Sequence, residues 1–145
     1  HFIVAARGEE GFATSASVLN PANAEWAAQA PLLLLVVSKI TTDEGQFNPY
    51  GYYDAGLALQ NLTVQATALG LFVHQMAGFS AERARAAYAI PEGYAPVVMV
   101  AVGYLGDPDA LTERRREAEL TPRSRKPLRD FVFADVWGHP AALLE

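Results

Sequence analysis

The 145-residue chain contains no cysteine and only three histidines. The lack of cysteine excludes a disulfide framework, thiolate metal sites and a cysteine nucleophile, and it favours a cytoplasmic location. The histidines, His1, His74 and His139, are too scattered along the sequence to give the ligand spacing of a metal site. We therefore expect no bound metal.

Several nucleotide-binding and catalytic motifs are also missing. The sequence has no GxGxxG fingerprint, no GxxxxGK[ST] phosphate loop and no GxSxG nucleophile turn. No apolar run approaches the roughly 20 residues of a membrane span, so we expect no membrane insertion. An enzyme built on this chain would take its reactivity most simply from an organic cofactor.

Charge is scarce and its balance is acidic. Only 19% of the residues are charged and the formal net charge is −5, which argues against nucleic acid as a partner. The 51% hydrophobic content indicates a globular domain with apolar surface that a partner could cover. The length predicts one domain over residues 1–145. Because HFIVAARGEE reads as a strand from its first residues, and free ends fray, we expect this domain to be N-terminally incomplete.

The order of elements predicts an α/β or α+β fold with a mixed β-sheet. Strands are expected at 2–7, 31–40, 71–79, 95–104 and 131–137, and helices at 54–70, 81–90 and 107–120. Residues 9–30 read as helical or irregular turns, 41–53 as a long loop, and 138–145 as a tail. The continuous apolar run 31–40 is typical of a strand that is covered on both faces.

The helix predicted at 54–70 has unusual apolar character. Asp54 suits its N-cap and Gly70 its C′ position. One broad apolar face is made by Ala55, Ala58, Leu59, Leu62, Ala66 and Leu69, and a second, smaller one by Leu57, Val64 and Ala68. The second face would meet either another subunit or another part of the same chain.

A basic loop near the C-terminus, TPRSRKPLRD (121–130), stands out in an acidic chain. Arg123 and Arg125 are two residues apart, so in an extended segment their side chains point the same way and could bind one phosphate together. The alternative is an ordinary charged loop that balances Glu113, Glu117 and Glu119.

The segment VHQMAGF (73–79) changes character at its end. Gly78 would let a flat ligand approach the backbone, whose free N–H could donate a hydrogen bond. Alternatively, His74 and Gln75 are a polar pair inside a core, and Met76 is ordinary core filling.

Taken in order, YDAGLALQNLTVQATALGL, VHQMAGF, IPEGYAPVVMVAVGY, RSRKPL and FVFADVWG resemble the FMN-dependent nitroreductase family, from His1 nearly to the C-terminus. The resemblance implies an α+β fold with helices on both sides of a mixed sheet. It also implies an intertwined homodimer with FMN at each subunit interface, in which helix 54–70 forms the dimer core. The family's N-terminal helix and its Asn/Gln-Pro-Trp segment would precede His1.

The resemblance also assigns site residues. Arg123 and Arg125 fall where the family holds the FMN phosphate, and the segment Gln75, Met76, Ala77 and Gly78 lies where backbone meets the flavin ring. The N–H of Ala77 or Gly78 would donate to the flavin. Phe47 and Tyr50 belong to a variable region beside the substrate pocket.

The implied activity is passage of hydride from NAD(P)H through FMN to a nitroaromatic or quinone acceptor, with no side chain acting as acid or base. Two alternatives stay open. The chain could bind flavin without robust turnover, or it could be a non-catalytic α/β interaction domain.

Overall fold

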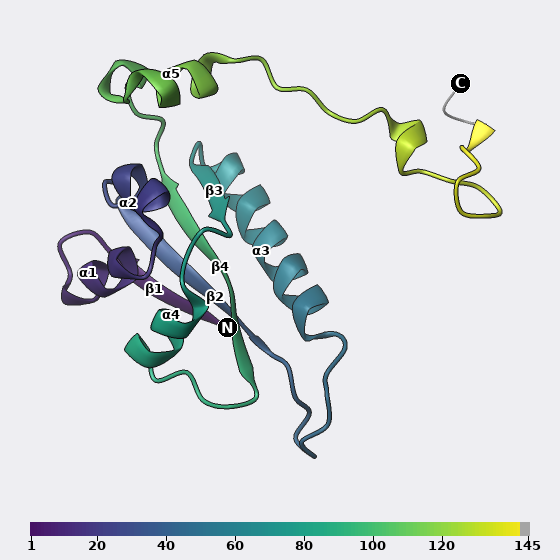
Figure 1. Cartoon of the computed structure of the whole chain (residues 1–145), viewed down its shortest axis with the longest axis horizontal. Helices are drawn as coiled ribbons and strands as arrows, with labels where there is room; N and C mark the ends of the chain where they lie inside the picture. The colour runs from purple at the N-terminus through teal and green to yellow at the C-terminus, as the bar shows by residue number, and fades with distance from the viewer. Residues whose placement is uncertain (143–145) are drawn as a thin grey trace. The chain divides into compact units, whose positions relative to one another are not determined.

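A computed structural model describes residues 1–142 of the chain. The chain divides into two compact units, His1–Gly106 (unit 1) and Asp107–Glu145 (unit 2). Figure 1 shows their elements in chain order.

Unit 1 is built on a four-stranded sheet with the order β1-β2-β4-β3. The strands are β1 (Phe2–Ala6), β2 (Leu32–Lys39), β3 (Phe72–Met76) and β4 (Tyr94–Gly103). All three pairings are antiparallel, with a register shift in β2 between Val36 and Val37. The α+β fold is confirmed, and the described strands make an antiparallel sheet where a mixed one was expected.

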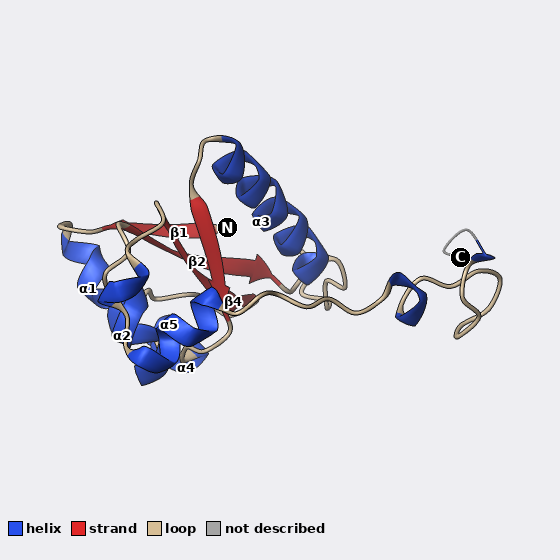
Figure 2. Cartoon of the chain, turned by 90° about the horizontal axis from the view of Figure 1, so that it is seen from above, coloured by secondary structure: helices blue, strands red, loops and turns tan. Residues whose placement is uncertain are grey.

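Helices cover both faces of this sheet, as Figure 2 shows. The helices α1 (Glu10–Ser17), α2 (Pro21–Ala27) and α4 (Ala81–Ala87) lie on one face, and α3 (Gly51–Ala68) lies on the other. Two cores result. Alternate residues of β2 face opposite cores, Leu33, Leu35 and Val37 toward the first and Leu34 and Val36 toward the second. This two-sided burial explains the continuous apolar run in the sequence.

The start of α3 corrects the sequence prediction. The helix begins at Gly51, with Tyr50 as its N-cap, and Asp54 lies in its first turn. A Cβ at Gly51 would lie 2.2 Å from the Lys39 carbonyl oxygen, so only glycine allows this approach. At the other end, Gly70 has φ +76° and confirms the predicted C′ glycine.

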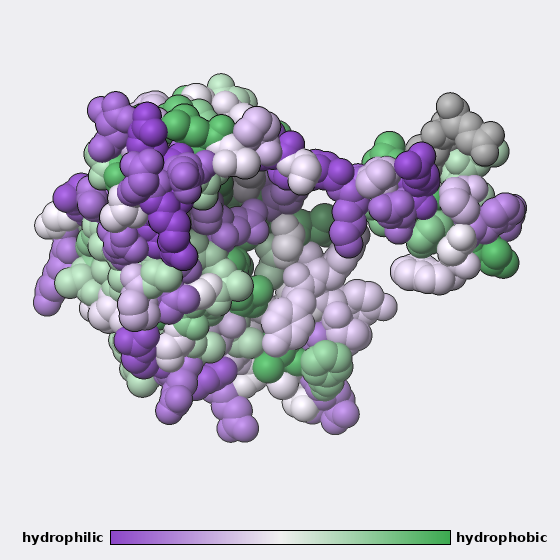
Figure 3. Space-filling view, turned by 45° about the horizontal axis from the view of Figure 1, so that its top comes forward, coloured by the Kyte–Doolittle hydropathy of each residue, from purple (hydrophilic) through white to green (hydrophobic). Residues whose placement is uncertain are grey.

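The two apolar faces of α3 meet different surroundings. Ala55, Leu59 and Ala66 are buried against the sheet, but Ala58 and Leu69 of the predicted inner face are exposed. Leu57 and Val64 of the second face are 49% and 59% exposed, so unit 1 does not enclose them. Figure 3 shows other hydrophobic residues, in green, reaching the surface among hydrophilic ones.

Unit 2 corrects two predictions. The expected helix 107–120 is a 3-10 turn, Pro108–Ala110, followed by α5 (Glu113–Leu120), because Leu111 takes an extended backbone and Thr112 begins a new helix. The expected strand 131–137 is absent from the described residues. After a second 3-10 turn, Leu128–Asp130, only an isolated bridge joins Phe133 to Pro140. Asp135 turns the backbone with φ +64°, which breaks an extended strand. Residues 143–145 of the predicted tail lie outside the described residues.

Candidate functional site

Two predicted site segments follow strands that run in the same direction. Both β2 and β3 pair antiparallel with β4, so they run in the same direction. The segment after β2, which contains Phe47 and Tyr50, and the segment after β3, which contains Ala77 and Gly78, therefore leave the sheet in the same direction. β3 ends at Met76, opposite Met99, whereas β2 continues past that level to Lys39, opposite Tyr94. The sequence alone did not give this shared direction.

The residues at the end of β3 divide by burial. Met76 is 2% exposed and belongs to the first core, as its reading as core filling predicted. Gln75 and Ala77 are exposed and Gly78 is half-buried. His74 is also exposed, with its ring edge-on to Trp26 at 4.7 Å, so His74 and Gln75 are not the buried polar pair of the alternative reading.

Gly78 is held by two asparagines that sequence reasoning did not select. Its carbonyl accepts hydrogen bonds from the Asn20 N–H at 3.0 Å and from Asn23 Nδ2 at 2.9 Å. Asn20 also caps α2, since its Oδ1 accepts from the Asn23 N–H. The Asn20-Pro21 pair is a helix-start signal, but nothing local in the sequence links it to Gly78.

The backbone beyond β3 leaves donors free. Among the described residues, the backbone N–H groups of Ala77 and Gly78 donate no hydrogen bond outside the helices and strands. Free N–H groups at a strand end can hydrogen-bond a flat, polar-edged ring. The residues at this position fit the edge of a flavin.

The loop between β2 and α3 presents aromatic side chains. Phe47 is 67% exposed and forms an isolated bridge with Thr41, while Tyr50 is 68% exposed at the start of α3. The side-chain oxygen of Asn48 accepts from the Tyr50 N–H, and its Nδ2 donates to the Lys39 carbonyl. These bonds fix the loop backbone and leave both aromatic rings available to a ligand.

The same loop carries a surface ion pair. The ammonium of Lys39 donates to the carboxylate of Asp43. This hydrogen bond, aided by the opposite charges, lowers the pKa of Asp43 and raises the pKa of Lys39. The pKa of Glu44 is lowered chiefly by its hydrogen bond with the Thr42 side chain. None of these carboxylates is buried enough to act as a proton donor near neutral pH.

Arg123 and Arg125 lie in unit 2, in an exposed segment without regular structure. Arg125 donates to the neighbouring Ser124 carbonyl, and within residues 1–142 neither arginine is part of an ion pair. An ion pair of unit 2 joins Arg116 to Asp109. The described residues thus leave both guanidinium groups free of acidic partners, as an anion site requires.

Two other kinds of site are missing from the described part of the chain. Residues 1–142 hold no group of three or more His, Asp or Glu side chains arranged for a metal ion. None of the helices described there combines the length and the apolar character needed to cross a bilayer.

Comparisons with known proteins agree with this arrangement. The sequence model of the Nitroreductase family matches residues 4–104. An uncharacterized 15.4 kDa protein of Mycolicibacterium smegmatis is 38% identical over 147 residues, which cover 96% of this chain and 98% of that protein.

Solved structures share the fold. A crystal structure described as an oxidoreductase containing FMN is 31% identical, with a TM-score of 0.89 over 96% of this chain and 72% of that one. A nitroreductase family protein from Clostridium difficile 630 has the same fold, at 23% identity and a TM-score of 0.66 over 94% of this chain and 73% of that one. The chain belongs to the nitroreductase family.

Proposed function

We propose that the chain is an FMN-dependent oxidoreductase that passes hydride from NAD(P)H to a nitroaromatic or quinone-type acceptor. The family match carries this proposal, because the matched residues include Gln75–Gly78. The N–H groups of Ala77 and Gly78, at the end of β3, support it because they are free to donate hydrogen bonds. The FMN-containing oxidoreductase that is 31% identical to the chain supports a flavin as the cofactor.

Each unit, taken by itself, carries residues that suit FMN. Arg123 and Arg125 would bind its phosphate, since two neighbouring guanidinium groups provide forked donors. The N–H groups of Ala77 and Gly78 would donate to the polar edge of its ring. Bound FMN supplies reversible acceptance of an electron pair, and the protein contributes orientation and fixed hydrogen-bond donors.

The acceptor would be held by aromatic contacts. Phe47 and Tyr50 expose their rings in the loop after β2, so a planar nitroaromatic or quinone can stack on them. We further propose a homodimer, in which the exposed face of α3 with Leu57 and Val64 packs against a second copy.

The experiment is an absorption spectrum of the protein after FMN is added and excess flavin is removed, followed by NADPH and NADH oxidation with and without a quinone. We expect a retained flavin spectrum and oxidation that depends on the acceptor. Retained flavin without oxidation would establish a binding module instead of a reductase. A colourless protein would overturn the FMN assignment and favour an interaction domain.

A further inference from the structure

Arg85, in the last turn of α4, fixes the turn that joins α4 to β4. Its guanidinium donates to the carbonyls of Ile90 and Pro91, at 3.1 and 2.9 Å. A third hydrogen bond goes to the carbonyl of Tyr94, the first residue of β4. Because the side chain is half-buried and its rigid group contacts three acceptors at once, it holds residues 90–94 in one conformation.

The backbone of this turn is strained. Ala89 has φ +48°, in the left-handed region that is unfavourable for a residue with a side chain. Gly93 has φ +83°, and a Cβ there would lie 2.4 Å from Thr41 Oγ1. Such conformations persist only where the surrounding structure imposes them. The three hydrogen bonds from Arg85 provide this constraint.

The same turn holds the loop that follows β2. The Gly93 carbonyl accepts a hydrogen bond from the Ile40 N–H at 2.8 Å and a weaker one from Thr41 Oγ1 at 3.5 Å. Ile40 and Thr41 are the first residues after β2. The loop of residues 40–50 therefore starts from the turn that Arg85 fixes.

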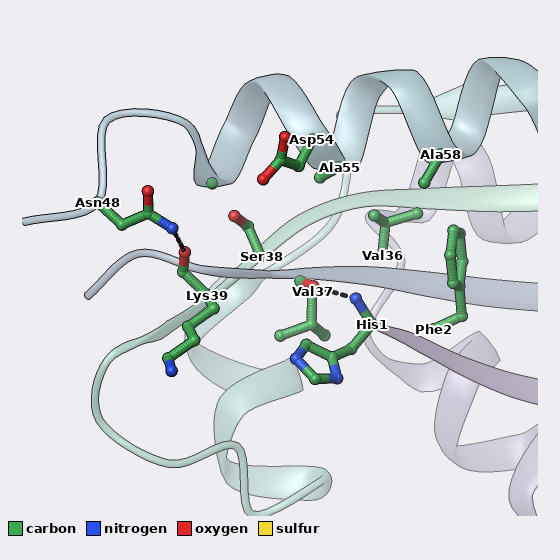
Figure 4. Close-up of a pocket in the computed structure, with 11 residues that line it drawn as sticks. His1, Phe2, Val36, Val37, Ser38, Lys39, Asn48, Asp54, Ala55 and Ala58 are labelled. Carbon is green, nitrogen blue, oxygen red and sulfur yellow. Dashed lines mark hydrogen bonds between the residues drawn. The ribbon is translucent and has the colours of Figure 1, made fainter. Parts of the chain in front are cut away.

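Hydrogen bonds inside the loop extend this constraint to its aromatic residues. The Asn48 N–H donates to the Ile40 carbonyl at 2.8 Å. The Asn48 side chain donates to the Lys39 carbonyl at 3.0 Å, as Figure 4 shows, and its oxygen accepts from the Tyr50 N–H. Phe47 pairs with the start of the loop in an isolated bridge. The positions of both aromatic residues thus depend on the backbone at Ile40.

We propose that Arg85 is a positioning residue for the loop of residues 40–50, and through it for Phe47 and Tyr50. Its link to acceptor binding rests on the proposed function, which assigns these two rings to the acceptor. In this role Arg85 acts through the backbone, so that an acceptor meets a preformed surface and less ordering is needed on binding. Its loss should weaken acceptor binding without changing the affinity for FMN.

Hydrogen exchange measured by NMR on Arg85→Ala tests the positioning. The amides of Ile40 and Asn48 should exchange about tenfold faster, since a charged hydrogen bond to a carbonyl contributes at least that factor. Amides of the buried central strand, such as that of Leu35, should change less, because they open only on global unfolding. Arg85→Lys should recover part of the protection, since an ammonium cannot span three acceptors.

Arg83 provides the matched control, because it also donates from α4 to three carbonyls, but at the end of α1. Arg83→Ala should leave the exchange of residues 40–50 unchanged relative to that of the sheet. Gly93→Ala gives a second arm, since its Cβ would displace Thr41 and should loosen the same loop. Gly8→Ala should not loosen it, because Gly8 has φ +96° but no atom within 4 Å of an added Cβ.

Turnover with menadione as acceptor tests the link to acceptor binding. Arg85→Ala should raise the KM for menadione about threefold to tenfold and change kcat and FMN affinity little, as expected when only binding is weakened. Arg83→Ala should leave this KM unchanged.

Equal loop exchange in Arg85→Ala and Arg83→Ala would overturn the proposal, as would an unchanged KM in a variant with a loosened loop. A parent protein that binds no flavin would instead mean failure of the proposed function. Hydrogen exchange would then decide by itself whether Arg85 positions the loop.

Discussion

Gly78 occupies a position where even a methyl group has no room. A Cβ there would lie 2.4 Å from Asn20 Nδ2 and 2.6 Å from Asn23 Nδ2. We predict that Gly78→Ala displaces the N-cap of α2 and lowers the free energy of unfolding by about 1–3 kcal/mol. Urea unfolding measures this change.

A glycine with open space provides the matched control. A Cβ at Gly56, inside α3, would meet no atom within 4 Å. Gly56→Ala should therefore stabilise the protein by up to about 1 kcal/mol, because alanine favours the helix. Equal effects of the two substitutions would contradict the role given to Asn20 and Asn23.

Substitution of the two arginines of the basic loop tests their predicted role in binding FMN. Arg123→Ala with Arg125→Ala should weaken FMN binding by about 1.5–3 kcal/mol for each charged hydrogen bond removed. Fluorescence quenching of FMN measures the affinity. Lys126→Ala, in the same loop, should have little effect. Unchanged affinity in the double variant would remove the basic loop from the site.

At the scale of elements, Arg83 ties α4 to the end of α1. Its guanidinium donates to the carbonyls of Ser17 and Leu19, at 2.8 and 3.2 Å, and to that of Val18. Arg83→Ala should lower the free energy of unfolding by about 1.5–3 kcal/mol, as expected when a charged donor to several carbonyls is lost. Arg83→Lys should recover only part, because an ammonium cannot span these acceptors. Thermal unfolding of both variants tests this, and full recovery by lysine would contradict it.

The loop after β2 carries a prediction about pH. Since the pKa of Asp43 lies below its ordinary 3.8 and that of Lys39 above its ordinary 10.5, their pairing stabilises the loop fully between these values. The contribution is lost as pH falls through the folded-state pKa of Asp43, and as pH rises through that of Lys39.

Substitution of the acidic partner tests this pairing. Asp43→Asn should return the pKa of Lys39 toward 10.5, whereas Glu44→Gln, whose charge is the weakest contributor, should change it little. NMR titration of the lysine Nζ–Cε signals measures both. A Lys39 pKa that stays raised in Asp43→Asn would contradict the pairing.

At the scale of the whole molecule, the exposed face of α3 predicts the oligomeric state. Leu57 and Val64 lie on one side of an 18-residue helix whose other side covers the sheet. We expect the protein to be a dimer by light scattering, and Leu57→Lys with Val64→Lys to make it a monomer, because burying two ammonium groups is costly. Leu105→Lys, at an exposed leucine of unit 1, should leave the dimer intact. A monomeric parent protein would contradict the assignment.

Local sequence signals predicted the elements whose determinants are local. Ser80 caps α4 by accepting from the Arg83 N–H at 3.1 Å, as its place before the helix indicated. The apolar run 31–40 predicted a strand covered on both faces, and Gly70 ends α3 as expected. The strand expected at 131–137 failed because apolar composition alone cannot show whether a partner strand is present.

The sequence by itself determined the α+β class and the family, since periodicity, capping and ordered motifs are local features, and its flavin-binding residues stay a prediction. Only the tertiary structure decided that β2 and β3 run in the same direction, because strand direction depends on pairing with β4. It also decided that Lys39 approaches Gly51, and Asn20 approaches Gly78, too closely for either glycine to carry a side chain. Contacts between residues this far apart follow from packing, and no local pattern encodes them.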